Sequence, residues 1–322
     1  MDAERVRVPS EGDTDDTDDV VRVRQVDVFS DAPMSGNGLA VVQSTAPLDP
    51  GLMQAITREL RQFETIFLTD VDGRGATARI FTEQEELAFA GHPVLGAAAV
   101  LHWEQQAHLD SADWRVRVGG RDLTVKTRRR PAGTVVDADM DQGRATTRLT
   151  LPPAQTHALA AALGVPGEQV RHDLPCQVVT TGLPYLLLPV TGPGLRGSRV
   201  TVPDLADRLH EVGADFAYVL DPDVPEGRTW DNAGAVEDVA TGSAAGPAGA
   251  YLIDHGLRPP EQPFPLHQGR FVGRPSVIRV RRDQEGSMWV GGPVVPFGSG
   301  VLTPGLTNLP RRTPSPGWPT PG

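Results

Sequence analysis

The chain has 322 residues, of which 39% are hydrophobic, and a formal net charge of −11 at pH 7. An acidic chain is repelled by a phosphate backbone, which argues against nucleic acid as a partner. The single cysteine, Cys176, excludes an internal disulfide, and no apolar run is long enough to predict a membrane-spanning helix. Because the N-terminus also lacks the pattern of a signal peptide, we expect a soluble, cytoplasmic protein with no membrane partner.

Composition along the chain predicts four segments. Residues 1–20 are rich in Asp and Glu, which predicts a disordered acidic tail. A boundary near Leu151-Pro152-Pro153 divides an N-terminal domain, residues 21–150, from a C-terminal domain, residues 151–298. Residues 299–322 are rich in Pro, Gly, Ser and Thr and predict a flexible tail. We expect neither tail to take part in chemistry.

The first half predicts strands around one amphipathic helix. Residues 21–29 and 39–42 are apolar and β-branched, with a turn at residues 35–38 between them. Asp49-Pro50 predicts the start of a helix that ends near Arg61. Further strands are expected at residues 63–69 and 77–81, and a hairpin around Gly119-Gly120 at residues 114–118 and 123–127.

A glycine turn then leads into a helix made of small residues. Residues 88–101 predict a strand end, the turn Gly91-His92-Pro93 and an Ala-rich helix. Proline suits the first turn of a helix, and a glycine beside it allows a ligand to approach the free amides. The partial positive charge of a helix start favours an anion such as a carboxylate.

The second half repeats this design. Strands are expected within residues 176–190 and at residues 216–220, with helices running from residue 153 to Leu163 and over residues 203–212. Residues 237–252 then pass through the turn Thr241-Gly242-Ser243 into another small-residue helix. A helix without a polar face has neighbours on every side, so we expect helices near residues 93–103 and 243–254 to be enclosed by sheets.

These motifs resemble the PhzF family of phenazine-biosynthesis proteins, within the diaminopimelate-epimerase-like fold. The resemblance runs from about residue 21 to residue 296, and the two glycine turns carry it most specifically. Other matching stretches are Val26-Asp27-Val28-Phe29, Ser35-Gly36-Asn37, Glu64-Thr65, Thr181-Gly182-Leu183-Pro184, Glu237-Asp238, Gln268-Gly269 and Arg274-Pro275-Ser276.

The resemblance implies a fold and a reaction. The fold is of α/β (α+β) class, with two pseudo-symmetric domains that each wrap a barrel-like, mostly antiparallel sheet around a central helix. The reaction is an isomerisation by proton or double-bond shift on a small organic acid, without a cofactor, in secondary-metabolite or antibiotic biosynthesis. The family also implies a homodimer.

The same resemblance implies site residues. Glu64 matches the proton-transfer carboxylate of the family, and His92 and Asp238 match its other catalytic positions. We expect Gly91, Gly242 and Ser243 to bind the substrate carboxylate. A carboxyl group that moves a proton to and from carbon needs a pKa raised by partial burial, so we expect this of Glu64.

Other chemistries fit the sequence less well. The eight histidines are scattered, so no metal site is expected, and no hydrolase triad can be assigned. A two-thiol racemase on the same fold needs two cysteines, whereas Cys176 alone, expected in a strand, reads as a buried hydrophobe. Departures from the family pattern at Gly38, residues 61–63 and Val239 leave the substrate open. They also leave open a non-catalytic small-acid-binding or scaffold protein.

Overall fold

The computed structural model describes residues 20–131 and 133–302. The described residues of the first half form nine strands and two helices. Their bounds are β1 Val21–Val28, β2 Asn37–Ser44, α1 Pro50–Leu60, β3 Glu64–Asp72, β4 Gly75–Phe81, β5 Glu86–Leu87, α2 Gly91–Gln105, β6 Ser111–Val118, β7 Arg121–Arg129, β8 Val136–Arg144 and β9 Thr146–Thr150.

The second half contains the remaining strands and helices. Their bounds are α3 Pro153–Ala162, β10 Gln177–Thr180, β11 Pro184–Pro189, α4 Gly192–Gly197, α5 Leu205–Glu211, β12 Phe216–Asp221, β13 Glu226–Arg228, α6 Gly242–Asp254, β14 Phe264–Gln268, β15 Ser276–Arg282 and β16 Ser287–Val301, with short 3-10 turns at Gly167–Gln169 and Arg270–Val272.

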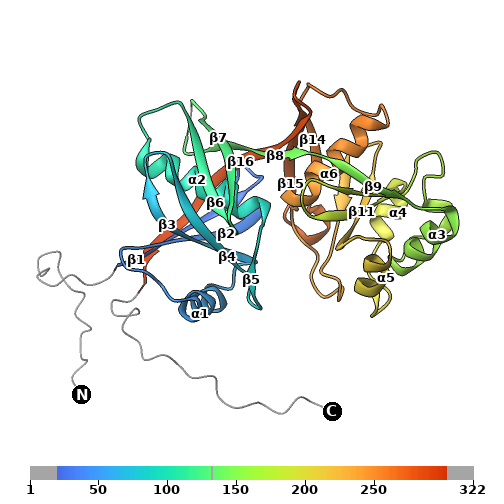
Figure 1. The fold of residues 1–322 in the computed structure, drawn as a ribbon, viewed down its shortest axis with the longest axis horizontal. Coiled ribbons are helices and arrows are strands. Elements are labelled where there is room, and N and C mark those ends of the chain that lie inside the picture. Colours follow the sequence, from blue (N-terminus) through green and yellow to red (C-terminus); the bar gives the residue numbers. More distant parts are fainter. Residues whose placement is uncertain (1–19, 132, 303–322) are drawn as a thin grey trace, which may run out of the picture.

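A closed barrel surrounds α2. Its strand order is β1-β2-β3-β4-β6-β7-β8-β16, and β16 closes it by pairing with β1. Only the β2–β3 and β4–β6 pairs are parallel, so the barrel is mostly antiparallel. Figure 1 shows α2 inside this ring of strands, which confirms the predicted α+β fold with a central helix.

The second half forms a curved sheet of similar design around α6. The strand path continues β16-β15-β14-β13-β12-β11-β10-β9, and within the described residues no pairing closes it into a ring. Helix α6 contacts β10, β11, β12, β15 and β16. Helices α3, α4 and α5 lie on the outer side of this sheet, where Leu159, Leu195 and Leu209 pack against strand residues such as Leu186.

Small residues allow both central helices to be enclosed. Every residue of α2 from Gly91 to His102 is buried, as are Ala244 to Ile253 in α6. A Cβ at Gly96 would lie 2.4 Å from Leu39, and one at Gly249 would lie 2.3 Å from Val280. The predicted enclosure of both helices is therefore confirmed.

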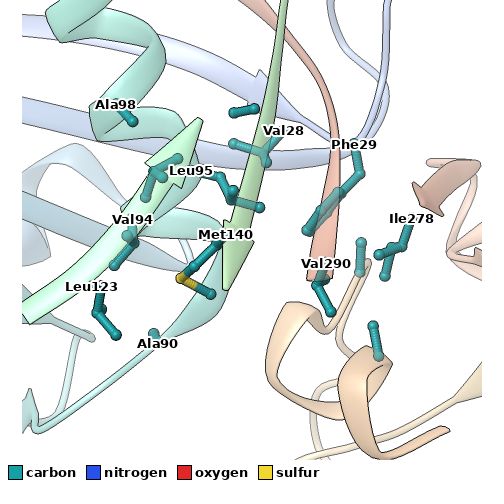
Figure 2. Packing of buried hydrophobic residues seen from close by; sticks show 14 of the residues in the cluster. Val28, Phe29, Ala90, Val94, Leu95, Ala98, Leu123, Met140, Ile278 and Val290 are labelled. Carbon is teal, nitrogen blue, oxygen red and sulfur yellow. The ribbon is translucent and has the colours of Figure 1, made fainter. Parts of the chain in front are cut away.

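One hydrophobic core joins the two halves. Figure 2 shows Val94 and Leu95 of α2 near Met140 of β8, and Phe29 near Val290 of β16. The same cluster of buried residues continues to Ala244 and Leu252 of α6. The two central helices thus share a continuous apolar interior.

The structure corrects several expectations. Both central helices begin earlier than predicted, at Gly91 and Gly242, because the glycine turn itself is the first helical turn. Asn37 and Gly38 belong to β2 rather than to a turn, since they pair with β1. Cys176 lies directly before β10 rather than within a strand.

The predictions for the tails and for the domain boundary have different outcomes. The tail expected from residue 299 is wrong for residues 299–301, because they pair with β1 as the end of β16. Residues 1–19 and 303–322, to which the other tail predictions apply, lie outside the described residues. The division between residues 21–150 and 151–298 stays a prediction, and β16 pairs with strands of both halves.

Candidate active site

Glu64 begins β3 in the interior of the molecule. Parallel pairing with Leu39 of β2 fixes its position, and the residue is only 6% exposed. Its Oε2 atom has no hydrogen-bond partner. Burial, and then the negative charge of Asp238, raise the pKa of Glu64 to about 8. A buried carboxyl that keeps its proton at neutral pH is suited to moving a proton, as the sequence predicted.

His92 faces Glu64 from the first turn of α2. Its Nδ1 atom lies 3.4 Å from Glu64 Oε2 and 3.4 Å from Asn37 Nδ2. Burial lowers the pKa of His92 to about 3, so its ring is neutral at pH 7. The contact between His92 and Glu64 is therefore not an ion pair. The buried Nε2 atom of His92 also lacks a partner.

Asp238 supplies a second carboxyl from the segment before α6. One oxygen accepts hydrogen bonds from Asn37 Nδ2 at 3.1 Å and from the Ala240 amide at 3.3 Å. The other accepts from the Thr241 hydroxyl at 2.5 Å. Burial raises the pKa of Asp238, and these donors act in the opposite direction because they stabilise the carboxylate.

The starts of α2 and α6 meet at this place. No side chain caps the first amides of either helix. A Cβ on Gly91 would lie 3.0 Å from the Ser243 nitrogen, and one on Gly242 would lie 3.4 Å from the His92 nitrogen. A side chain at Gly91 would therefore crowd the start of α6, and one at Gly242 would leave little space beside α2. Together they present amide donors and two positive dipole ends to one region.

Ser243 gains a partner that the sequence reasoning missed. Its hydroxyl lies 2.7 Å from the hydroxyl of Tyr185 on β11, and burial raises the pKa of this tyrosine. Tyr185 follows the Thr181-Gly182-Leu183-Pro184 motif, so its position in the sequence pointed to the region but not to the contact. Asn37 was also missed as a site residue, although it stood in a matching motif.

An arginine from the second half anchors the turn that carries Asn37. The Arg274 guanidinium contacts Asp27 at 2.6 Å and donates to the carbonyl of Gly36 at 2.7 Å. The Ser35 hydroxyl donates to the Pro275 carbonyl at 2.8 Å. These contacts hold the residues before Asn37 against the second half, and so fix the amide that joins Asp238 to His92.

The structure thus brings all of the predicted site residues together. Glu64, His92 and Asp238 surround the meeting point of Gly91, Gly242 and Ser243. Their roles stay predictions. Within residues 20–131 and 133–302, no group of three or more His, Cys, Asp or Glu side chains is arranged to hold a metal ion. In that same part of the chain, no helix has the length and apolar character needed to cross a membrane.

Comparisons with known proteins identify the family of this chain. The family model for PhzC-PhzF, phenazine biosynthesis-like protein, matches residues 26–300. A trans-2,3-dihydro-3-hydroxyanthranilate isomerase from Pseudomonas fluorescens is 33% identical over 86% of this chain and 97% of its own length.

Solved structures give the same result. A predicted epimerase from Pseudomonas aeruginosa is 47% identical, with a TM-score of 0.82 over 87% of this chain and 98% of that chain. A probable proline racemase from Agrobacterium radiobacter K84 shares the fold alone, at 12% identity and a TM-score of 0.57 over 88% of this chain and 93% of that chain. The chain belongs to the PhzC-PhzF family of phenazine biosynthesis-like proteins and is an isomerase of that family.

Proposed function

We propose that this isomerase shifts a proton and a double bond within a small carboxylic acid, using Glu64 and no cofactor. The observation that carries the proposal is the buried Glu64 carboxyl, whose Oε2 atom has no partner and whose pKa is raised to about 8. An unpartnered buried polar atom is costly unless a ligand completes its contacts. Substrate binding supplies that missing contact.

The step is a transfer within one molecule. The Glu64 carboxylate accepts a proton from one carbon, and the C–H electron pair moves along the adjoining double bond. Glu64 then returns the proton to the carbon at the far end, so that atoms and charge balance. His92 donates a hydrogen bond to the substrate or to its developing enol-like oxygen, and Asp238 holds an amine or hydroxyl group.

The helix starts bind the acid. The amides around Gly91 and Gly242, with the Ser243 hydroxyl, are placed to receive the substrate carboxylate. The relative from Pseudomonas fluorescens is named for trans-2,3-dihydro-3-hydroxyanthranilate, which makes this acid the first candidate substrate. We further propose a role in secondary-metabolite biosynthesis, with a related unsaturated or amino-acid-derived acid as the alternative substrate.

The test follows the transferred proton in heavy water. The protein is incubated with trans-2,3-dihydro-3-hydroxyanthranilate and with a panel of related unsaturated acids, and carbon-bound deuterium and product are measured by NMR. We expect wild type to isomerise one of these acids. Turnover by Glu64→Gln should be lower by about 100-fold or more, while the variant still binds the acid. Glu59→Gln, on the exposed side of α1, is the matched control.

The outcomes separate the alternatives. Near wild-type turnover by Glu64→Gln overturns the assignment of Glu64. Binding of an acid without isomerisation or exchange by wild type supports the non-catalytic alternative instead. Because Glu64 must first accept a proton, kcat/KM of wild type should rise with pH and level off above about 8.

The oligomeric state and location also stay proposals. We propose a homodimer in the cytoplasm, on the resemblance and on the single-cysteine composition respectively. Light scattering at micromolar concentration tests the first, since a monomer mass would contradict it.

A further inference from the structure

A chain of hydrogen bonds leads from Asp238 into the core of the second half. The Thr241 hydroxyl contacts Asp238, and the Gln268 side-chain amide donates to that hydroxyl at 2.9 Å and to the Asp238 carbonyl at 2.9 Å. The Gln268 carbonyl oxygen accepts from the Thr241 amide at 3.2 Å and from the Tyr218 hydroxyl at 3.1 Å. These hydrogen bonds thus join residues of β12, β14 and the start of α6.

The direction of every bond in this chain is fixed. The Thr241 backbone amide can only donate and the Asp238 carbonyl can only accept, which sets the orientation of the Gln268 amide. That amide donates to the Thr241 hydroxyl, and Asp238 is the hydroxyl's other partner among the described residues, so the hydroxyl proton has an acceptor only when it points to Asp238. Asn37 and the Ala240 amide donate to the other carboxyl oxygen. Both oxygens of Asp238 are therefore acceptors, one of two bonds and the other of one, and each donor stabilises the ionised form.

Tyr218, at the end of this hydrogen-bond network farthest from Asp238, is held rigidly by packing. Tyr218 is completely buried on β12, and its ring has room only because residue 227 on the neighbouring strand is glycine. A Cβ at Gly227 would lie 2.0 Å from the Tyr218 ring. Gln268 is 1% exposed, and its side-chain oxygen and nitrogen each make two hydrogen bonds. Such a saturated buried network fixes the groups that it contacts.

We propose that Thr241, Gln268 and Tyr218 are positioning residues that hold Asp238 as the permanent carboxylate of the site and so leave the mobile proton to Glu64. The second clause rests on the proposed function, whereas the first concerns Asp238 alone. The titratable groups that face Asp238 are Glu64 from β3, His92 from α2, Tyr185 from β11 and Tyr218 from β12. His92 and both tyrosines stay neutral between pH 5 and pH 9, because burial lowers the pKa of the first and raises those of the others.

The experiment titrates Asp238 directly. In the full chain with ¹³C-labelled aspartate carboxyls, Asp238→Asn identifies the Asp238 signal, and NMR follows it from pH 4 to pH 9 without substrate. Thr241→Val removes the hydroxyl donor and should raise the Asp238 pKa, whereas Thr241→Ser should keep the wild-type value. Turnover of the acid by Thr241→Val should fall about tenfold or more, in kcat rather than in KM.

Tyrosine variants test the far end of the chain. Tyr218→Phe keeps the ring and should raise the Asp238 pKa by less than Thr241→Val does. Tyr251→Phe is the matched control, because this buried tyrosine donates to the Pro175 carbonyl instead and its loss should leave Asp238 unchanged. If Thr241→Val does not fold, Tyr218→Phe alone decides the matter.

Each outcome is decisive. An Asp238 pKa at the wild-type value in folded Thr241→Val, or in Tyr218→Phe when that variant stands alone, overturns the inference. An equal shift in Tyr251→Phe also overturns it, since the effect would then be general. Failure of wild type to isomerise any acid would overturn the proposed function without changing the titration, so the two failures can be told apart.

Discussion

The two carboxyl groups of the site differ in their hydrogen-bonding surroundings. Glu64 on β3 of the closed barrel is buried, and Asp238 before α6 of the open sheet is half-buried. Glu64 Oε2 has no hydrogen-bond partner, whereas both oxygens of Asp238 accept bonds from fixed donors. Burial raises the pKa of both carboxyls, and only at Asp238 do hydrogen-bond donors oppose that rise.

The same contrast extends to the two sheets that carry these residues. The first half, whose barrel closes through β16, contains Glu64 and His92. Each of these side chains has a buried polar atom without a hydrogen-bond partner. The sheet around α6 supplies Thr241, Gln268 and Tyr218, which are bonded to one another. Carboxyl groups in such different hydrogen-bonding environments are suited to different roles in proton transfer.

Replacing Asp238 by Asn should have the largest effect. The change removes the carboxylate that holds the substrate and the like charge that helps to raise the Glu64 pKa. We expect turnover to fall about 100-fold or more and the pKa seen in kcat/KM to move below that of wild type. Asp207→Asn, at an exposed position of α5, is the control. Wild-type turnover by Asp238→Asn would contradict a role for this carboxyl in the site.

Replacing Glu64 by Gln should change how stability depends on pH. The folded pKa of Glu64, about 8, exceeds the ordinary glutamate value of 4.5, so its protonated form stabilises the fold at low pH. That stabilisation is lost as pH rises through about 8. From pH 5 to pH 9, wild type should lose roughly 3–4 kcal/mol more unfolding free energy than Glu64→Gln does. Urea unfolding at both pH values measures this, and parallel curves would contradict a raised pKa.

Substitution within a central helix should test its enclosure. A Cβ at Gly249 of α6 would overlap Val280, so Gly249→Ala should lower the free energy of unfolding by about 1–3 kcal/mol. Gly197→Ala is a control, since a Cβ there meets nothing within 4 Å. Equal stability of the two variants would show that the sheet around α6 is more open than the structure indicates.

Truncating Asn37 should weaken the link between the two regions. Its amide donates to Asp238 and to the Ala240 carbonyl and lies beside His92. In Asn37→Ala we expect turnover to fall about tenfold, because a bond to a charged group contributes roughly that factor. Steady-state kinetics measure the change, and Asn37→Asp should be no better, since it places a further negative charge beside Asp238.

Replacing Cys176 by Ala should have the smallest effect. Burial raises the pKa of this thiol to about 12, so it stays protonated and unreactive at neutral pH. Turnover should remain within a few-fold of wild type. A loss of activity in a folded Cys176→Ala protein would favour a thiol mechanism over the Glu64 assignment.

Local pattern determined much of the architecture. The alternation of β1, the Asp49 cap of α1 and the Gly119-Gly120 hairpin were all predicted from nearby residues, because such signals act within a few positions. The small residues of α2 and α6 predicted that both helices are enclosed, since an exposed helix has a polar face. The matching motifs also pointed to the six site residues before any contact was known.

The tertiary structure alone decided which side chains of the site are hydrogen-bonded to one another. Asn37, Asp238 and Gln268 lie far apart in the chain, and their hydrogen bonds depend on strand register and on the meeting of α2 with α6. Tyr218 and Tyr185 looked like ordinary strand residues, because no local pattern shows where a buried hydroxyl points. The sequence by itself therefore predicted which carboxyls lie at the candidate site. Only the fold decided which of them has its hydrogen bonds filled, because those donors come from segments brought together by packing.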